Sequence, residues 1–219
     1  MATEFTVDGL AFTTIDDESV EVTGADVEGD VVIPSSTNDS GASYAVASIG
    51  DHAFSSRDSL VSVVIPDSVR SIGANAFSGC GSLTSVEIPD SVTSVGEAAF
   101  SDCESLISVA ISNSMLMIEP GAFDGCESLE SVVIPDSVKS ICGRAFARCS
   151  SLVSVTIGRS VNVIEKEAFL GCDSLTSVVI PDAVTMIAPD AFEEEVLLVT
   201  AAGDPWSARS QSLTDDSSI

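Results

Sequence analysis

The apolar positions of this chain recur every 23 residues, and one pattern of apolar and polar positions occurs seven times. Its clearest marker is an Ala-Phe pair, whose phenylalanine occupies positions 54, 77, 100, 123, 146, 169 and 192. Leucine recurs in phase at 60, 83, 106, 129, 152, 175 and 198, and isoleucine at 65, 88, 111, 134, 157 and 180. A fixed period without insertions predicts an array of stacked structural repeats.

Each repeat is predicted to begin with a strand. After Leu60, the apolar Val63 and Ile65 alternate with outward-facing Ser62 and Val64, which is the period of a half-buried strand. Proline ends the strand because it has no N–H group for a ladder, and it occupies positions 66, 89, 135 and 181. One repeat cannot bury its own apolar side chains, whereas stacked repeats can share a continuous core.

The rest of each repeat is predicted to return the chain to the next strand. Val69 and Ile72 indicate a second, short extended segment, and residues 76–80 resemble one helical turn that closes the coil. Two repeats depart from the pattern, since Ser112 and Gly158 occupy the position of the corner proline. A Met-Leu-Met segment also replaces more polar residues at 115–117, so we expect a local irregularity over residues 112–120.

The repeat string SLTSVxIPDSVTSIGxxAFxGC resembles the BspA-like class of leucine-rich repeats, over about residues 33–198. The segments FTVDGLAFTTI, VEVTG, GDVVIP and YAVASIG also resemble the start of such domains. The resemblance implies a mostly β repeat solenoid, a right-handed superhelix with a parallel β-sheet, short helical turns and an N-terminal β cap. It also implies a non-catalytic module, because that class is associated with cell-surface attachment and protein binding.

Three parts are expected along the chain. Residues 1–45 form a β-rich cap with the first corner loop, and residues 46–197 form the solenoid of 23-residue repeats. The interval from Ile33 to Ile65 is 32 residues, so the corner loop carries nine more than one period and includes residues 35–44. Residues 198–219 supply a last partial strand, over 198–202, and a polar tail from 204 that we expect to be mobile.

The charge of the chain narrows the classes of partner. The sequence has 34 Asp plus Glu against 8 Lys plus Arg, a formal charge of −26, which repels nucleic-acid phosphates and anionic lipid headgroups. We therefore expect a monomer that binds protein, with no nucleic-acid partner, no membrane insertion and no cofactor. The first residues contain no basic segment followed by an apolar run, which favours the cytoplasm, whereas the resemblance favours the cell surface.

Five cysteines stand in one column of the repeat, at 80, 103, 126, 149 and 172, and Cys142 lies outside it. We interpret Cys80, Cys103, Cys126, Cys149 and Cys172 as a structural ladder of buried thiols, because a small apolar side chain packs well at a tight corner. Disulfides between neighbouring turns, about 5 Å apart, remain an alternative. Metal ligation has less support because the sequence has no C-x-x-C spacing.

Nothing in the sequence favours catalysis, and we predict that the chain is not an enzyme. His52 is the only histidine, it stands in a variable column, and no G-x-S-x-G motif accompanies it. One corner column contains Asp67, Asp90, Asp136 and Asp182, which we expect to bond nearby backbone N–H groups. A weakly bound cation bridging them is the alternative.

The candidate binding residues lie on the outward face of the long strands or where the period is disturbed. On the strands they are Ser85, Glu87, Ser108, Ala110, Ser131 and Val133. The alternatives are an exposed patch of Met115, Leu116 and Met117, and the N-terminal loop with Tyr44. A protein-interaction module, similar to an adhesin, is the first functional hypothesis. The second is a structural, solubility-tuned scaffold without a dedicated ligand site.

Overall fold

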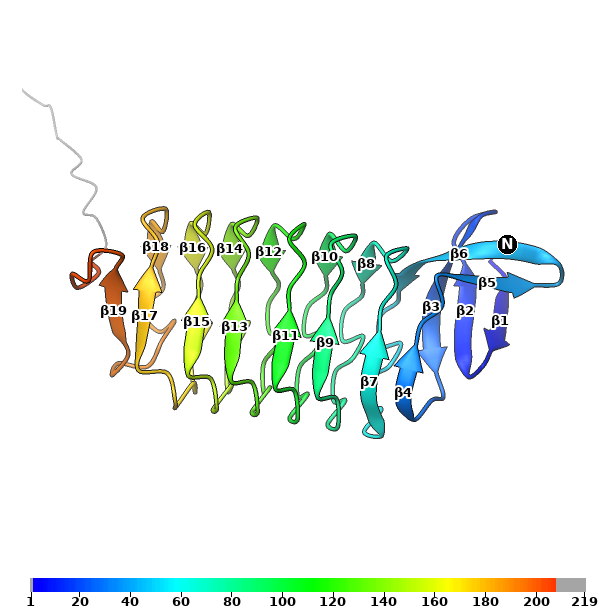
Figure 1. Cartoon of the computed structure of the whole chain (residues 1–219), viewed down its shortest axis with the longest axis horizontal. Coiled ribbons are helices and arrows are strands. Elements are labelled where there is room, and N and C mark those ends of the chain that lie inside the picture. The colour runs from blue at the N-terminus through cyan, green and yellow to red at the C-terminus, as the bar shows by residue number, and fades with distance from the viewer. Residues whose placement is uncertain (1, 208–219) are drawn as a thin grey trace, which may run out of the picture.

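A computed structural model describes residues 2–207 and has the form of an elongated β-solenoid (Figure 1). The predicted repeat solenoid is thus confirmed, although residues 2–207 contain no helix. Parallel strands follow one another along its length. Eight of them lie along one face, namely β4 (Gly29–Val32), β7 (Leu60–Val64), β9 (Ser85–Glu87), β11 (Ser108–Ala110), β13 (Ser131–Val133), β15 (Ser154–Thr156), β17 (Ser177–Ile180) and β19 (Leu197–Thr200).

We call these eight strands the long-strand face. Strands β4 to β15 form one parallel sheet, and β17 pairs with β19 in a second. The register repeats from turn to turn, since Ser85 of β9 lies opposite Ser108 of β11, and Ser131 of β13 lies opposite Ser154 of β15. Inward residues of these strands are buried, including Val86 and the leucine that precedes each strand in phase. The period-two alternation predicted from the sequence therefore holds.

Shorter strands form a second face of the solenoid. They are β8 (Ser71–Ile72), β10 (Ser94–Val95), β12 (Met117–Ile118), β14 (Ser140–Ile141), β16 (Val163–Ile164) and β18 (Met186–Ile187). This face is divided between β10 and β12, within the predicted irregularity. A Cβ added at Gly96 would lie 2.5 Å from the Ala74 nitrogen, so the turns at this corner approach closely only without a side chain. The next turn has Glu119 at the corresponding position, and the ladder of short strands is interrupted between these two turns.

Side-chain hydrogen bonds connect the departing corner at residues 112–114 to the turn before it. The Ser112 hydroxyl donates to the Val92 carbonyl at 2.6 Å, and the Asn113 N–H donates to Oδ1 of Asp90 at 2.8 Å. The hydroxyl of Ser114 donates to the main-chain carbonyl of Asp90 at 2.7 Å. The sequence change at the corner is thus compensated locally, and the long-strand face continues past it.

The third side of each coil is a turn, where a helical turn had been expected. Six of the seven repeats place two residues with positive φ four positions apart, and the pairs include His52 with Ser56 and Arg144 with Arg148. Left-handed residues terminate helices, which accounts for the incorrect helical prediction. Main-chain bonds instead connect neighbouring coils, as where the Phe54 N–H donates to the Ala76 carbonyl at 2.7 Å.

A column of stacked phenylalanine rings runs through the core. The seven Ala-Phe rings lie 4.8–5.5 Å apart between neighbouring centroids, with interplanar angles of 3–11°. Six of them, from Phe54 to Phe169, are fully buried, and Phe192 of the last turn is slightly exposed. The sequence marker of the repeat is therefore also its central packing element.

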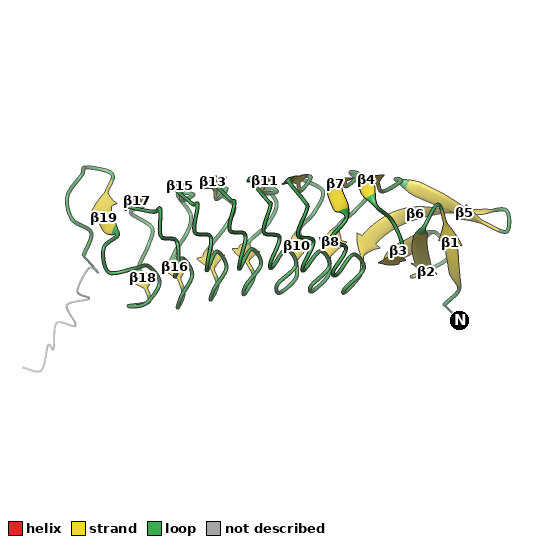
Figure 2. Cartoon of the chain, turned by 90° about the horizontal axis from the view of Figure 1, so that it is seen from below, coloured by secondary structure: helices red, strands yellow, loops and turns green. Residues whose placement is uncertain are grey.

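The N-terminal cap contains β1 (Glu4–Val7), β2 (Leu10–Thr14), β3 (Ser19–Ala25), β5 (Ser36–Asp39) and β6 (Ala42–Ile49). The segment expected as a corner loop is instead the β5–β6 hairpin, which extends outward at this end (Figure 2). Strand β6 crosses the boundary expected after residue 45 and pairs with both β3 and β8. Cap and solenoid are thus joined by one continuous sheet.

The C-terminal end is covered by the chain itself. The predicted last strand is present as β19, and the residues after it turn back over its free edge. Val199 bridges to Pro205, and the Trp206 N–H donates to the Leu198 carbonyl at 2.9 Å. The tail expected from residue 204 therefore begins as a cap, while residues 208–219 lie outside the described residues.

Candidate functional site

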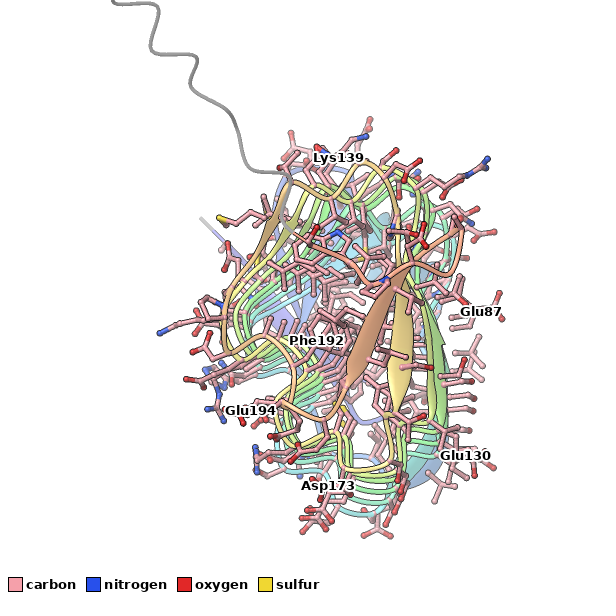
Figure 3. All side chains as sticks on the ribbon, turned by 90° about the vertical axis from the view of Figure 1, so that its left-hand side faces the viewer. Glu87, Glu130, Lys139, Asp173, Phe192 and Glu194 are labelled. Carbon is pink, nitrogen blue, oxygen red and sulfur yellow. The ribbon has the colours of Figure 1, made fainter. Side chains whose placement is uncertain are left out.

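The outward side of the long-strand face is the broadest candidate surface. All six predicted strand residues lie exposed on it, namely Ser85, Glu87, Ser108, Ala110, Ser131 and Val133. In Figure 3, Glu87 and Glu130 project from this side, whereas Glu194 projects from the other side and Phe192 lies between them in the interior. The phase of the repeat thus brings residues 23 apart into rows on one surface.

Apolar side chains are concentrated on this face and charged ones are scarce. Each of the six coils from β7 to β17 has three outward positions at its long strand. Of these eighteen positions, only Glu87 and Glu130 are charged. A typical soluble surface has about 25–35% charged residues. Among the described residues, twelve large apolar side chains are exposed, and eight belong to this face: Val32, Val61, Val64, Ile107, Val133, Val153, Val179 and Leu197. The chain therefore exposes a weakly charged apolar surface on an otherwise acidic molecule.

The alternative patch at residues 115–117 is only partly present. Leu116 and Met117 are exposed, but Met115 is 1% exposed, so its prediction as a surface residue was wrong. Met115 occupies the core column of Val92 and Val138, and its side chain fills the same inward position. What remains is a small apolar group on the divided face.

Tyr44 is not a loop residue either. It belongs to β6, and its half-buried ring packs against Phe5 with centroids 6.0 Å apart. Phe5 in turn stacks on Phe12 at 5.5 Å. Tyr44 therefore serves the packing of the cap, because the predicted loop is a paired hairpin.

The structure places all six cysteines in buried positions as free thiols. In the column, each Sγ–H donates to the carbonyl of the phenylalanine 26 residues earlier, at 3.1–3.3 Å, as Cys126 does to Phe100. Burial raises the pKa of the Cys80 thiol to about 11 and that of Cys172 to about 12. The pKa values of Cys103, Cys126 and Cys149 are also raised by burial. Neutral thiols of this kind are poor nucleophiles and poor metal ligands.

A cluster of ion pairs on the turn side was not predicted. Asp124, with a side chain only 13% exposed, accepts hydrogen bonds from Arg144 Nη2 at 3.0 Å and from Arg148 Nε at 2.8 Å. Arg144 also pairs with Glu167 at 2.8 Å, and Arg148 with Asp102 at 2.9 Å. Two arginines four residues apart, in phase with acidic residues of neighbouring turns, were the signal available in the sequence. The charged side chains of this cluster pair with one another and connect four turns of the solenoid.

The residues considered for catalysis or cation binding are separated or already engaged. His52 lies exposed in the first turn with a φ of 58°. Asp90 and Asp136 accept main-chain N–H bonds from Asn113 and Arg159 of the next corner, at 2.8 and 2.7 Å, so these two aspartates connect neighbouring turns rather than closing their own. Within residues 2–207, no three His, Cys, Asp or Glu side chains are grouped as metal ligands, and no helix could span a membrane.

Comparison with known proteins agrees with this architecture. The model of the BspA type leucine rich repeat region matches residues 38–142 and 116–200, in six copies. A leucine rich cell surface protein of Faecalibacterium prausnitzii has 34% identity and a TM-score of 0.81 over 91% of this chain and 55% of its own. The chain therefore spans about half the length of that protein.

Two further structures extend the comparison. The leucine-rich repeat protein TpLRR of T. pallidum has 33% identity and a TM-score of 0.75, over 84% of this chain and 86% of its own. A leucine-rich repeat protein from Eubacterium ventriosum, at 24% identity, shares the fold with a TM-score of 0.76, over 87% of this chain and 49% of its own. No curated protein sequence matches. Together with the 23-residue period and the parallel stacking, these matches show that the chain belongs to the BspA-type leucine-rich repeat family.

Proposed function

We propose that the chain is a non-catalytic protein-binding module that contacts its partner through the long-strand face. The observation that carries this proposal is the exposure there of eight of the twelve large apolar side chains, in rows with only three charged residues, Asp30, Glu87 and Glu130. Apolar side chains gathered on one weakly charged face of an acidic protein support an interaction site there. Neutral surface also avoids the desolvation of carboxylates that any other side of this acidic molecule would require.

The composition of the face defines what the partner must supply. Its outward residues are Ser, Thr, Ala, Val, Ile and Leu, with Glu at two positions, Asp at one, and no aromatic side chain or arginine. Aromatic and arginine side chains dominate the binding energy of most interfaces. We therefore assign the large anchoring side chains to the partner, which is a protein, with one copy of this chain as the binding unit.

A cell-surface role follows as the finer part of the proposal. The protein of Faecalibacterium prausnitzii is described as a leucine rich cell surface protein, and this chain aligns with about half of it. An adhesion-like module repeated along a surface protein would fit such an arrangement. The competing hypothesis is a scaffold without a ligand site, for which the face would have no preferred binding position.

Selection of binders from a random peptide display library tests the proposal. Peptides selected on the wild-type chain should lose binding to Ser131→Arg/Val133→Arg, which places two cations at the centre of the face. They should retain binding to Leu116→Asp/Met117→Asp on the divided face, which is the matched control. Selections must be repeated at several salt concentrations, because screening changes contacts with so acidic a surface. Binders distributed over both faces, or none at any salt concentration, would support the scaffold hypothesis.

A further inference from the structure

The strands of the long-strand face are hydrogen-bonded in pairs. Strands β4 and β7 share four register positions, and β9–β11 and β13–β15 share three each. Between these pairs the ladder nearly stops, since β7–β9 and β11–β13 share one position each, Ser62 with Ser85 and Ser108 with Ser131. A uniform parallel ladder would bond every strand equally to both neighbours. The C-terminal halves of alternate strand pairs are therefore separated.

Main-chain donors mark where the separation occurs. The N–H groups of Ile33, Ile88 and Ile134 donate to the next turn at 2.8–3.0 Å. In the intervening turns, the corresponding N–H groups of Ile65, Ile111 and Ile157 have no hydrogen-bond partner among the described residues. Ile65 and Ile111 are also 7% and 8% exposed, against 2% for Ile88 and 1% for Ile134. Each interruption thus exposes the core edge slightly and leaves one main-chain N–H without an acceptor among the described residues.

The interruption between β7 and β9 forms a hollow with a volume of about 380 Å³. Apolar atoms of Val63, Val64, Ile65 and Pro89 line it, together with Ser62 and Ser85. Its only ionisable lining residues are Asp67 and Glu87. Arg70 donates to the Asp67 main-chain carbonyl at 2.6 Å but does not line the hollow.

We propose that this hollow receives a lysine or arginine side chain of the protein partner. The aliphatic stem of such a side chain covers the valine and isoleucine surface, and its charged head meets the two carboxylates. The Ile65 N–H offers a donor to a carbonyl of the same partner segment. This inference rests on the proposed function, since it selects one anchoring residue for a partner lying on the long-strand face.

The chain contains its own matched control. The interruption between β11 and β13 has the same single register position and the same unsatisfied isoleucine N–H. There, Asn113 stands in the column of Asp67 and Val133 in the column of Glu87. The two interruptions therefore share one register pattern and differ in charge, and only the acidic one should bind a basic side chain.

The test uses amide NMR spectra of the full chain titrated with the peptide acetyl-Val-Lys-Val-amide at about 0.15 M ionic strength, where long-range attraction is screened. We expect saturable shifts at residues 62–67 and 85–89, and no comparable shifts for the peptide with norleucine in place of lysine. Glu87→Val should weaken binding about fivefold, the upper range for a partly exposed ion pair. Glu130→Val removes the same charge from the same face and should change binding less than about twofold.

A gain of binding completes the experiment. Val133→Glu should create a second, weaker set of shifts at residues 108–113 and 131–135, because it supplies one of the two carboxylates missing there. Equal weakening by Glu87→Val and Glu130→Val, equal binding of the norleucine peptide, or shifts spread over all acidic columns would overturn the proposal. Library binders that still map to the long-strand face would then leave the proposed function intact, so the two failures are distinguishable.

Discussion

The thiol of Cys103 donates a hydrogen bond to the main-chain carbonyl of Phe77 at 3.3 Å, connecting the thiol column to the phenylalanine column in the turn before. The same bond joins Cys126 to Phe100. Thiol hydrogen bonds are weak, but these thiols have no access to water because the side chains are fully buried. The two columns therefore form one packed unit whose ionisation state matters for stability.

Stability should fall at alkaline pH because of these thiols. Burial raises their folded-state pKa, to about 11 for Cys80 and about 12 for Cys172, whereas an unfolded thiol ionises near pH ~8.5. The unfolded chain therefore releases protons first, so the stabilisation is fully present below about pH 8.5 and is lost as the pH rises toward 11. Each thiol contributes a slope of about 1.4 kcal/mol per pH unit in that window. Urea unfolding between pH 7 and pH 10 measures it.

Cys126→Ala should reduce that slope by the share of one thiol, while also lowering stability through the cavity it leaves. Val132→Ala is the control, since it removes buried apolar volume and no ionisable group. The interpretation fails if both variants have the wild-type pH slope. A thiol reagent should also label the native chain slowly and all six cysteines after unfolding.

Backbone strain in the turn columns should be measurable by exchanging alanine and glycine. Ala98 has a φ of 52°, and Gly121 occupies the same column one turn later with a φ of 61°. A left-handed conformation costs an L-residue roughly 1–2 kcal/mol, so Ala98→Gly should stabilise the chain by about 0.5 kcal/mol after the entropic cost of glycine. Gly121→Ala should cost about 1 kcal/mol, because a Cβ there meets no atom closer than 3.8 Å and only the backbone resists it.

The adjacent Ala99 provides the control for this experiment. It is fully buried and its φ is not in the left-handed region, so Ala99→Gly should destabilise the chain by about 1 kcal/mol. Urea midpoints of the three variants give the comparison. Destabilisation by Ala98→Gly of the same size as by Ala99→Gly would contradict a strained column.

The ion-pair cluster should depend on its central carboxylate. Asp124→Ala leaves Arg144 and Arg148 without their shared acceptor, and we expect a loss of about 2 kcal/mol in unfolding free energy. Asp102 is half exposed and bonds only Arg148, so Asp102→Ala should cost less than about 1 kcal/mol. Thermal or urea unfolding distinguishes the two. Equal costs would mean that the burial of Asp124 has no energetic consequence.

The C-terminal cap should be detectable through the only tryptophan of the chain. Trp206 packs against the core at the last turn, and Trp206→Ala should lower the stability of that turn by about 2 kcal/mol through lost apolar burial. Hydrogen exchange of the β17 and β19 amides should accelerate in this variant, and exchange near β7 should not. Ser207→Ala, one residue further, is the control and should leave both regions unchanged.

The sequence by itself determined the architecture of this protein. The 23-residue period assigns the core columns, the strand face and the region where the second face is divided, because residues in the same phase occupy the same position in every stacked coil. The column of Val92 and Val138 could also have shown that Met115 points inward, had the phase been applied to it. Local hydrophobic pattern therefore carries most of the fold.

Only the tertiary structure decided how neighbouring coils and the two ends fit together. The paired strands, the hollow beside Glu87 and the cluster around Asp124 all depend on hydrogen bonds between residues at least 20 positions apart. The cap hairpin with Tyr44 and the return of Trp206 over β19 likewise satisfy free strand edges, which a periodic pattern does not describe. A repeat specifies what each coil buries, whereas contacts between coils select which surface residues become a site.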